Sequence, residues 1–426
     1  MSASPRGALA VILMLSCLAA APPARAQAGV PADLGAAAAE QAAVRQALAR
    51  FMIAVQAETH DALLPTLTAA DRAAIDTRRA LGQPVFAVKE LAGLWRLASA
   101  NAKEVTTAEA LSGMIISLTE PDRARADIQP LLSFRASIHL AREEGAWRVD
   151  LARTLQCGRQ PRPKEEILSL CRQALRGIAE DVDVVQTEHF LLLTHTGPEP
   201  TRAAIEALEA LYNEFQERFP FDQGRDDAPG APSVARVTGP DPYMVVFLFS
   251  HAPTYRKFTE RYAPGSRRAA GFATPSGYFA TCFGPTFHSL VRHEGTHLLM
   301  YRRMRLFGAP NWLAEGMAET MADPNDAPVS DRKLREMLRQ GKKLGLGPLM
   351  DKQKIAAGTD YHLSQSLVHF LRRRHPEQWD ALIRFTRQFD SPHPAECRTE
   401  LLRLLDMDQS QLDAAWREHL LQVAVE

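Results

Sequence analysis

Hydrophobic positions near the start of the chain follow a helical spacing and then, further on, an alternating one. Apolar residues three or four apart predict an amphipathic helix that carries Val44, Leu48, Phe51, Met52 and Val55. Two alternating segments, "SFRASIHL" (133–140) and "WRVDL" (147–151), flank the polar turn "REEGA". Alternation on both sides of a short turn predicts a β-hairpin. We therefore expect residues 38–155 to form a small α+β domain.

The rest of the chain predicts a second, larger unit. "GRQPRP" (158–163) is typical of a linker, and a helix is expected to start at Lys164. The apolar patterns then predict a strand in "TEHFLLLTHT", an amphipathic helix over 205–219, a loop over 222–242, a buried strand over 243–249 and another strand over 277–283. From Ser330 onward the patterns are mostly helical. This order predicts an α+β domain over 164–330 and a helical C-terminal subdomain over 331–426.

The N-terminus has the features of a signal peptide. Arg6 precedes an apolar run over 8–21, and "ARA", ending at Ala26, supplies small residues for cleavage. "AQA", ending at Ala28, is a second possible cleavage site, and Cys17 also allows a lipoprotein signal. We expect residues 1–26 to be removed and the mature protein to be periplasmic or secreted. No later segment reaches the roughly 18 apolar residues of a transmembrane helix.

Charge and length narrow the range of partners. The 426 residues contain 50 Lys plus Arg and 50 Asp plus Glu, so the net charge is near zero. A chain without basic excess has no electrostatic basis for binding nucleic acid, and nucleic acid is therefore not expected as a partner.

Cysteine usage agrees with export. Without Cys17, four cysteines remain, which allows two disulfides in an oxidising compartment. Four cysteines allow three pairings, and the sequence alone does not choose among them. Cys157 and Cys171, which bracket the linker, are the first expected pair, and Cys282 with Cys397 would then be the second. Cys282 precedes the histidine motif described next, so as a free thiol it would be a rival metal ligand.

The segment "HEGTH" (293–297) carries the strongest chemical signal. His293 and His297 are four apart on an expected helix, so both imidazoles face one side and can bind one metal ion, with Glu294 beside them. Thirteen histidines make a chance match possible, so a third ligand is needed. Glu315, in "PNWLAEGMAET", is the candidate, and Glu319 one turn later could hold a ligand imidazole. The alternative for these two glutamates is a solvated helix face.

These two motifs together resemble the gluzincin zinc metallopeptidases, and within them the bacterial peptidase MA-like families. The resemblance implies a zincin-like fold, Zn²⁺ held by His293, His297 and Glu315, and Glu294 as the general base. It also implies a peptide or protein substrate. A strand over Gly277, Tyr278, Phe279 and Ala280 would then lie along the cleft and pair with the substrate backbone, unless it is an interior strand already paired on both sides.

A third segment, "YHLSQSLVHFL" (361–371), is similar to the tyrosine-bearing helix of aminopeptidase N-like gluzincins. The resemblance makes Tyr361 the donor to a developing oxyanion, although Ser364 stands where that family has glycine. A structural aromatic is the alternative for Tyr361, and His362 is a rival donor. The G-x-M-E-N element that recognises a free amine is absent. His288, His369 and His375 are expected to be surface or packing residues.

The N-terminal region resembles the nuclear transport factor 2-like (SnoaL-like) cone, which implies an accessory domain that could bind a protein partner. The sequence thus predicts an exported zinc peptidase. Two alternatives remain: a zinc hydrolase for another bond, or a peptidase-like binding or scaffold protein of the cell envelope. An intact Glu294 argues against a pure scaffold, which needs no general base.

Overall fold

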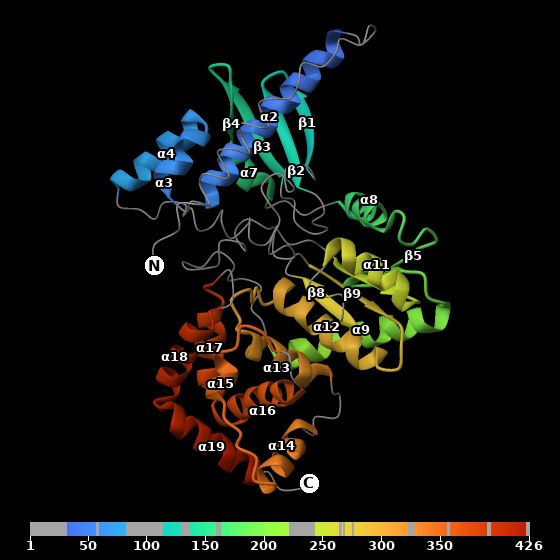
Figure 1. Cartoon of the computed structure of the whole chain (residues 1–426), viewed down its shortest axis with the longest axis vertical. Helices are drawn as coiled ribbons and strands as arrows, with labels where there is room; N and C mark the ends of the chain where they lie inside the picture. The colour runs from blue at the N-terminus through green and yellow to red at the C-terminus, as the bar shows by residue number, and fades with distance from the viewer. Residues whose placement is uncertain are drawn as a thin grey trace.

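The computed structural model describes residues 32–56, 59–81, 114–128, 137–158, 163–220, 243–263, 266, 269–274, 277–322, 329–355, 358–389 and 393–422. The architecture is mixed α+β with two separate sheets, which confirms the expected class (Figure 1). The expected signal peptide and the expected loop over 222–242 lie outside the described residues. None of the described helices combines the length and apolar composition needed to cross a bilayer.

The N-terminal unit is a four-stranded antiparallel sheet with helices packed on it. It comprises α2 (Ala32–Gln56), α3 (His60–Leu63), η1 (Leu64–Thr66), α4 (Ala69–Ala80), β1 (Met114–Glu120), β2 (Arg123–Ile128), β3 (Ser137–Glu143), β4 (Ala146–Val149) and α7 (Leu151–Gly158), with strand order β1-β2-β3-β4. The expected hairpin is confirmed, and Glu144 and Gly145 turn it with φ of 51° and 78°.

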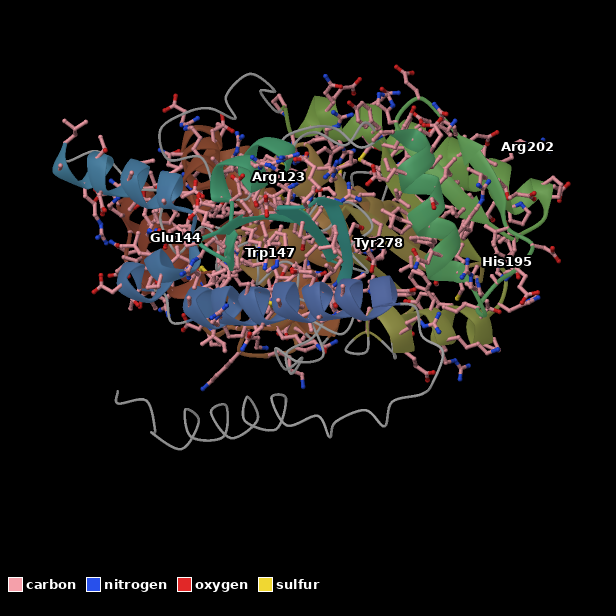
Figure 2. The ribbon with its side chains drawn as sticks, turned by 90° about the horizontal axis from the view of Figure 1, so that it is seen from above. Arg123, Glu144, Trp147, His195, Arg202 and Tyr278 are labelled. Atoms are coloured by element: carbon pink, nitrogen blue, oxygen red, sulfur yellow. The ribbon has the colours of Figure 1, made fainter. Side chains whose placement is uncertain are left out.

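The unit has its own core. The apolar stripe of α2 is buried as the spacing predicted, against Leu140 and Val149 of the sheet. Trp147 on β4 packs into this core beside α2, and its indole Nε1 donates a hydrogen bond to Glu40 Oε2 at 2.9 Å (Figure 2). Figure 1 shows this unit at one end of the molecule.

The second sheet has strand order β5-β6-β7-β9-β8 and is covered on both faces. Its strands are β5 (Asp183–Gln186), β6 (Phe190–Thr194), β7 (Met244–Phe249), β8 (Gly271–Thr274) and β9 (Tyr278–Cys282). β6, β7 and β9 are parallel, whereas β5 and β8 are antiparallel to their neighbours. Alternate residues of β7 point to two different cores, which explains its continuous apolar run.

Helices supply the two covers of this sheet. α8 (Lys164–Leu175) and α11 (Ala252–Tyr262) contribute Ile167 and Phe258 to the core on one face. α9 (Pro198–Arg218) and α12 (Phe287–Arg302) contribute Leu208 and Val291 to the core on the other. α8 begins at Lys164, as the sequence predicted. The site described below lies on the α12 side.

The remainder is helical, as predicted from Ser330 onward. It comprises α13 (Asn311–Ala322), α14 (Val329–Arg339), α15 (Gly347–Met350), α16 (Gly358–Arg374), α17 (Pro376–Thr386), α18 (Pro394–Leu405) and α19 (Gln409–Gln422). These helices share one continuous core with the α12 face of the sheet, with Trp312, Leu367 and Trp416 fully buried in it. The C-terminal helices therefore pack as part of the same body as the sheet.

Two sequence predictions are wrong. The strand over Gly277–Ala280 was expected along an open edge, but β9 is interior: Phe279 pairs with Val246 of β7 and with Ala273 of β8. The expected Cys282–Cys397 disulfide is absent, and both residues are free thiols. Cys282 lies beside the α11 core while Cys397 is buried in α18, so different packing layers hold them. The side chain of Cys157 lies outside the described residues.

Candidate metal centre

Two crossing helices bring the centre together. α12 presents His293 and His297 one turn apart, and its opposite side packs on α9. Gly295 serves that packing, because a Cβ there would come within 2.6 Å of Leu211 Cδ2. The glycine of the motif thus allows α12 to approach α9 closely. This close approach offsets the roughly 1 kcal/mol by which glycine weakens a helix relative to alanine.

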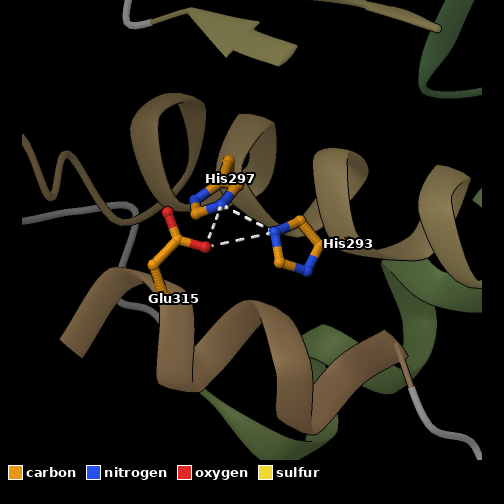
Figure 3. Close-up of side chains that lie close together, drawn as sticks. All are labelled: His293, His297 and Glu315. Carbon is orange, nitrogen blue, oxygen red and sulfur yellow. Dashed lines mark hydrogen bonds and ion pairs between the residues drawn. The ribbon is translucent and has the colours of Figure 1, made fainter. Parts of the chain in front are cut away.

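The third side chain comes from α13. Glu315 points across to the two imidazoles, and all three side chains converge between the helices (Figure 3). Glu315 Oε2 lies 3.2 Å from His293 Nε2 and 3.5 Å from His297 Nε2, and the two nitrogens are 3.3 Å apart. The predicted ligand set is therefore assembled in space.

These separations can be compared with those around a metal ion. Two ligand atoms bound at about 2.0–2.1 Å in a tetrahedron lie about 3.3 Å apart. The three atoms match this triangle. Although it is close to both nitrogens, the buried Glu315 Oε2 makes no hydrogen bond of acceptable geometry with the described residues. The three residues could therefore hold a metal ion.

A further carboxylate orients one imidazole. Glu319, one turn after Glu315, places Oε1 3.2 Å from Nδ1 of His293. Gln365 of α16 donates to the Glu319 carbonyl at 2.9 Å and anchors that turn of α13. A carboxylate on Nδ1 fixes the tautomer that presents Nε2 as a ligand, which is the role predicted for Glu319.

Close contact between α13 and α16 supports this geometry. A Cβ at Gly316 would lie 2.4 Å from the backbone oxygen of Ser364, so only glycine permits this separation of the two helices. Gly316 directly follows Glu315, and the contact therefore fixes the turn that carries the carboxylate.

Glu294 lies between the two imidazoles in sequence but faces the sheet. Glu294 is only 7% exposed, and a Cβ on Gly271 of β8 would come within 2.8 Å of Glu294 Cγ. A hydrogen bond from the Ala273 backbone also reaches it. The carboxylate is thus held between α12 and the edge strand β8, where it interacts electrostatically with His293 and His297.

The charges of the centre shift its pKa values in opposite directions. Burial lowers the pKa of His293, but the carboxylates of Glu315, Glu319 and Glu294 outweigh it and raise the pKa to about 10. Burial also raises the pKa of Glu315, but the two imidazoles outweigh it and hold the pKa below its usual range. Burial raises the pKa of Glu294 despite the opposing imidazoles.

Of the two candidate donors on α16, only Tyr361 faces the centre. Its ring lies 6.4 Å from that of His293, edge to face, and burial together with Glu315, Glu319 and Glu294 raises the pKa of its hydroxyl to about 12. His362 instead contacts α14 through Ser330 Oγ at 2.9 Å and Lys333 Nζ at 3.3 Å. The rival role for His362 is therefore wrong, since both ring nitrogens point away from the centre.

Sequence analysis missed two tyrosines and one strand. Tyr301 follows His297 by one helical turn, and burial, together with Glu315 and Glu294, raises the pKa of its hydroxyl. Tyr255 buries a hydroxyl without a partner among the described residues, and its pKa is raised by burial and by Glu294. The one-turn spacing could have identified Tyr301, whereas no local pattern identifies Tyr255. The strand β8 was missed because "GFAT" is too short to predict alone.

Comparison with known proteins adds no further assignment. No family model matches the chain, and no curated protein matches it in sequence. The function proposed below is therefore argued from the residues of the site and their arrangement.

Proposed function

We propose that the chain is an exported zinc-dependent peptidase of the gluzincin type, with a zincin-like body and an N-terminal accessory domain. The observation that carries the proposal is the triangle of His293 Nε2, His297 Nε2 and Glu315 Oε2, with sides of 3.2, 3.3 and 3.5 Å beside the buried Glu294. Two imidazoles and one carboxylate, with a fourth position left for water or substrate, are a common ligand set of catalytic zinc.

The residues around the triangle divide the chemistry among them. A bound zinc ion would polarise the scissile carbonyl and lower the pKa of water. Glu294 is the general base. Burial raises its pKa, which suits a carboxylate that accepts a proton and later returns it to the leaving amine. Tyr361 keeps its proton at neutral pH because its pKa is about 12, so it can donate a hydrogen bond to an oxyanion.

The strand that could hold an extended substrate is β8. It is the last strand of its sheet, and of the described strands only β9 pairs with it. It also lies directly against Glu294 at Gly271. An extended peptide added to this edge would place its carbonyls beside the general base. This assignment replaces the one made for Gly277–Ala280, whose backbone groups are already used by β7 and β8.

Metal content tests the ligand set. Untagged protein in which His297 is replaced, His297→Ala, should contain one zinc fewer per chain than the unaltered protein. His288→Gln is the matched control, because His288 is an exposed histidine on the same helix outside the triangle. Equal zinc content in the His297→Ala variant and the unaltered protein would show that these residues are not the ligands.

A further inference from the structure

A second cluster of ligand-type side chains lies in the helical part of the chain, outside the centre described above. Asp331 of α14, His369 of α16 and His419 of α19 each offer one ligand atom, and these atoms lie within 4.8 Å of one another. The donor set is again two imidazoles and one carboxylate. Sequence analysis had expected His369 to be a surface or packing residue. Its two neighbours in the cluster are 38 and 50 positions away in the sequence.

Two of the three side chains in this cluster are deeply buried, and two of their polar atoms have no hydrogen-bond partner among the described residues. Asp331 is 1% exposed and His419 is 3% exposed. Asp331 Oδ2 lies 3.0 Å from His369 Nδ1, but its other oxygen, Oδ1, has no partner among the described residues. His419 Nε2 is also buried without a partner. A buried carboxylate oxygen and a buried ring nitrogen left unpaired are costly, since each has lost its hydrogen bonds to water.

From this geometry we infer that Asp331, His369 and His419 bind a second divalent transition-metal ion, which joins α14, α16 and α19. An ion bound among these side chains would give Asp331 and His419 a further partner, and imidazole with carboxylate suits zinc and its neighbours in the first transition row. Asp331 and His419 are buried and His369 is partly buried, which favours a structural ion over one that meets substrate.

Two arginine side chains near the cluster oppose the binding of a cation. Arg374 Nε lies 3.4 Å from His419 Nδ1, and Arg335 is buried one turn from Asp331 with its Nε on the Leu420 carbonyl at 2.9 Å. Arg374 is exposed at the end of α16 and can turn to solvent when Nδ1 takes the proton.

The cluster shares helix α16 with the first centre. α16 carries Tyr361 beside the first centre and His369 eight residues later, about 12 Å along the helix axis. The same helix packs on α13 through Ser364 and Gly316. An ion at His369 would therefore stabilise the helix that supports the Glu315 turn, although it lies outside the proposed catalytic centre.

Zinc titration of a protein that lacks the first centre tests the inference. The untagged variant His293→Ala/His297→Ala should still bind one equivalent of zinc, with an increase in thermal unfolding temperature as zinc is added. Adding His419→Gln should abolish both effects, whereas adding His288→Gln should change neither. Arg374→Ala should bind zinc several-fold more tightly, because a competing cation is removed.

Several outcomes would overturn the inference. The inference would be wrong if the His293→Ala/His297→Ala variant bound no zinc. It would also be wrong if that variant still bound zinc after His419→Gln was added. Folding is checked with the single variants His419→Gln and His369→Gln, each of which should retain one equivalent at the first centre. Unchanged zinc content in the His293→Ala/His297→Ala variant relative to the unaltered protein would instead contradict the proposed peptidase centre.

Discussion

The contact between Gly271 and Glu294 permits a direct test of how Glu294, the proposed general base, is positioned. In Gly271→Ala, the new Cβ would lie 2.8 Å from Glu294 Cγ, about 0.6 Å closer than the 3.4 Å limit of ordinary contact. The backbone of Gly271 does not have positive φ, so alanine is tolerated there. The expected effect is displacement of the carboxylate by somewhat under 1 Å.

A displacement of about 1 Å at a catalytic group can cost about 10²-fold in rate. We therefore expect kcat of Gly271→Ala to fall by about one to two orders of magnitude, with KM changed much less and zinc content unchanged. The assay is steady-state hydrolysis of a peptide that the unaltered protein cleaves, together with elemental analysis. Gly284→Ala is the matched control, since a Cβ at Gly284 meets no atom within 4 Å. A folded Gly271→Ala variant with unaltered kcat would refute this placement of Glu294.

Three further predictions concern protons, thiols and stability. Because carboxylates raise the pKa of His293 to about 10, metal-free folded protein holds a proton there at neutral pH, which a metal must displace. Calorimetry at pH 7.5 in buffers of different ionisation enthalpy should show about one proton released on metal binding, and release of none would contradict the account. Thiol labelling of unfolded, unreduced protein should modify Cys282 and Cys397, and protection of both would contradict their free state. Trp147→Ala should lower the free energy of unfolding of the N-terminal unit, measured with denaturant, by about 3–5 kcal/mol, and Glu40→Gln is the milder control. Zinc content should be unchanged in Trp147→Ala, because the N-terminal core is separate from the core around the candidate metal centre.

Local patterns predicted most elements and brought attention to the residues of the candidate metal centre. The stripe over α2, the hairpin at Glu144 and Gly145, and the helices after Ser330 all follow from spacings within a few residues. His293 and His297 are one helical turn apart, so the sequence alone places them together. Glu315 was found because its motif is distinctive.

Features that depend on packing between distant segments could not be found in this way. The apolar run of β9 is equally compatible with an edge and an interior position, and its neighbours β7 and β8 decide between them. Asp331, His369 and His419 meet only because α14, α16 and α19 pack together. The close contact of Gly295 with Leu211 of α9 likewise joins segments that are far apart in the sequence.

Cleavage of an unbiased peptide library by zinc-loaded protein tests the central claim most directly, with unaltered protein compared against Glu294→Gln. The unaltered protein should cleave peptide bonds, whereas Glu294→Gln should contain the same zinc and cleave none, because glutamine cannot accept the proton. Equal cleavage by both proteins, or no cleavage by folded and zinc-loaded unaltered protein, would contradict the proposal of a peptidase in which Glu294 is the general base.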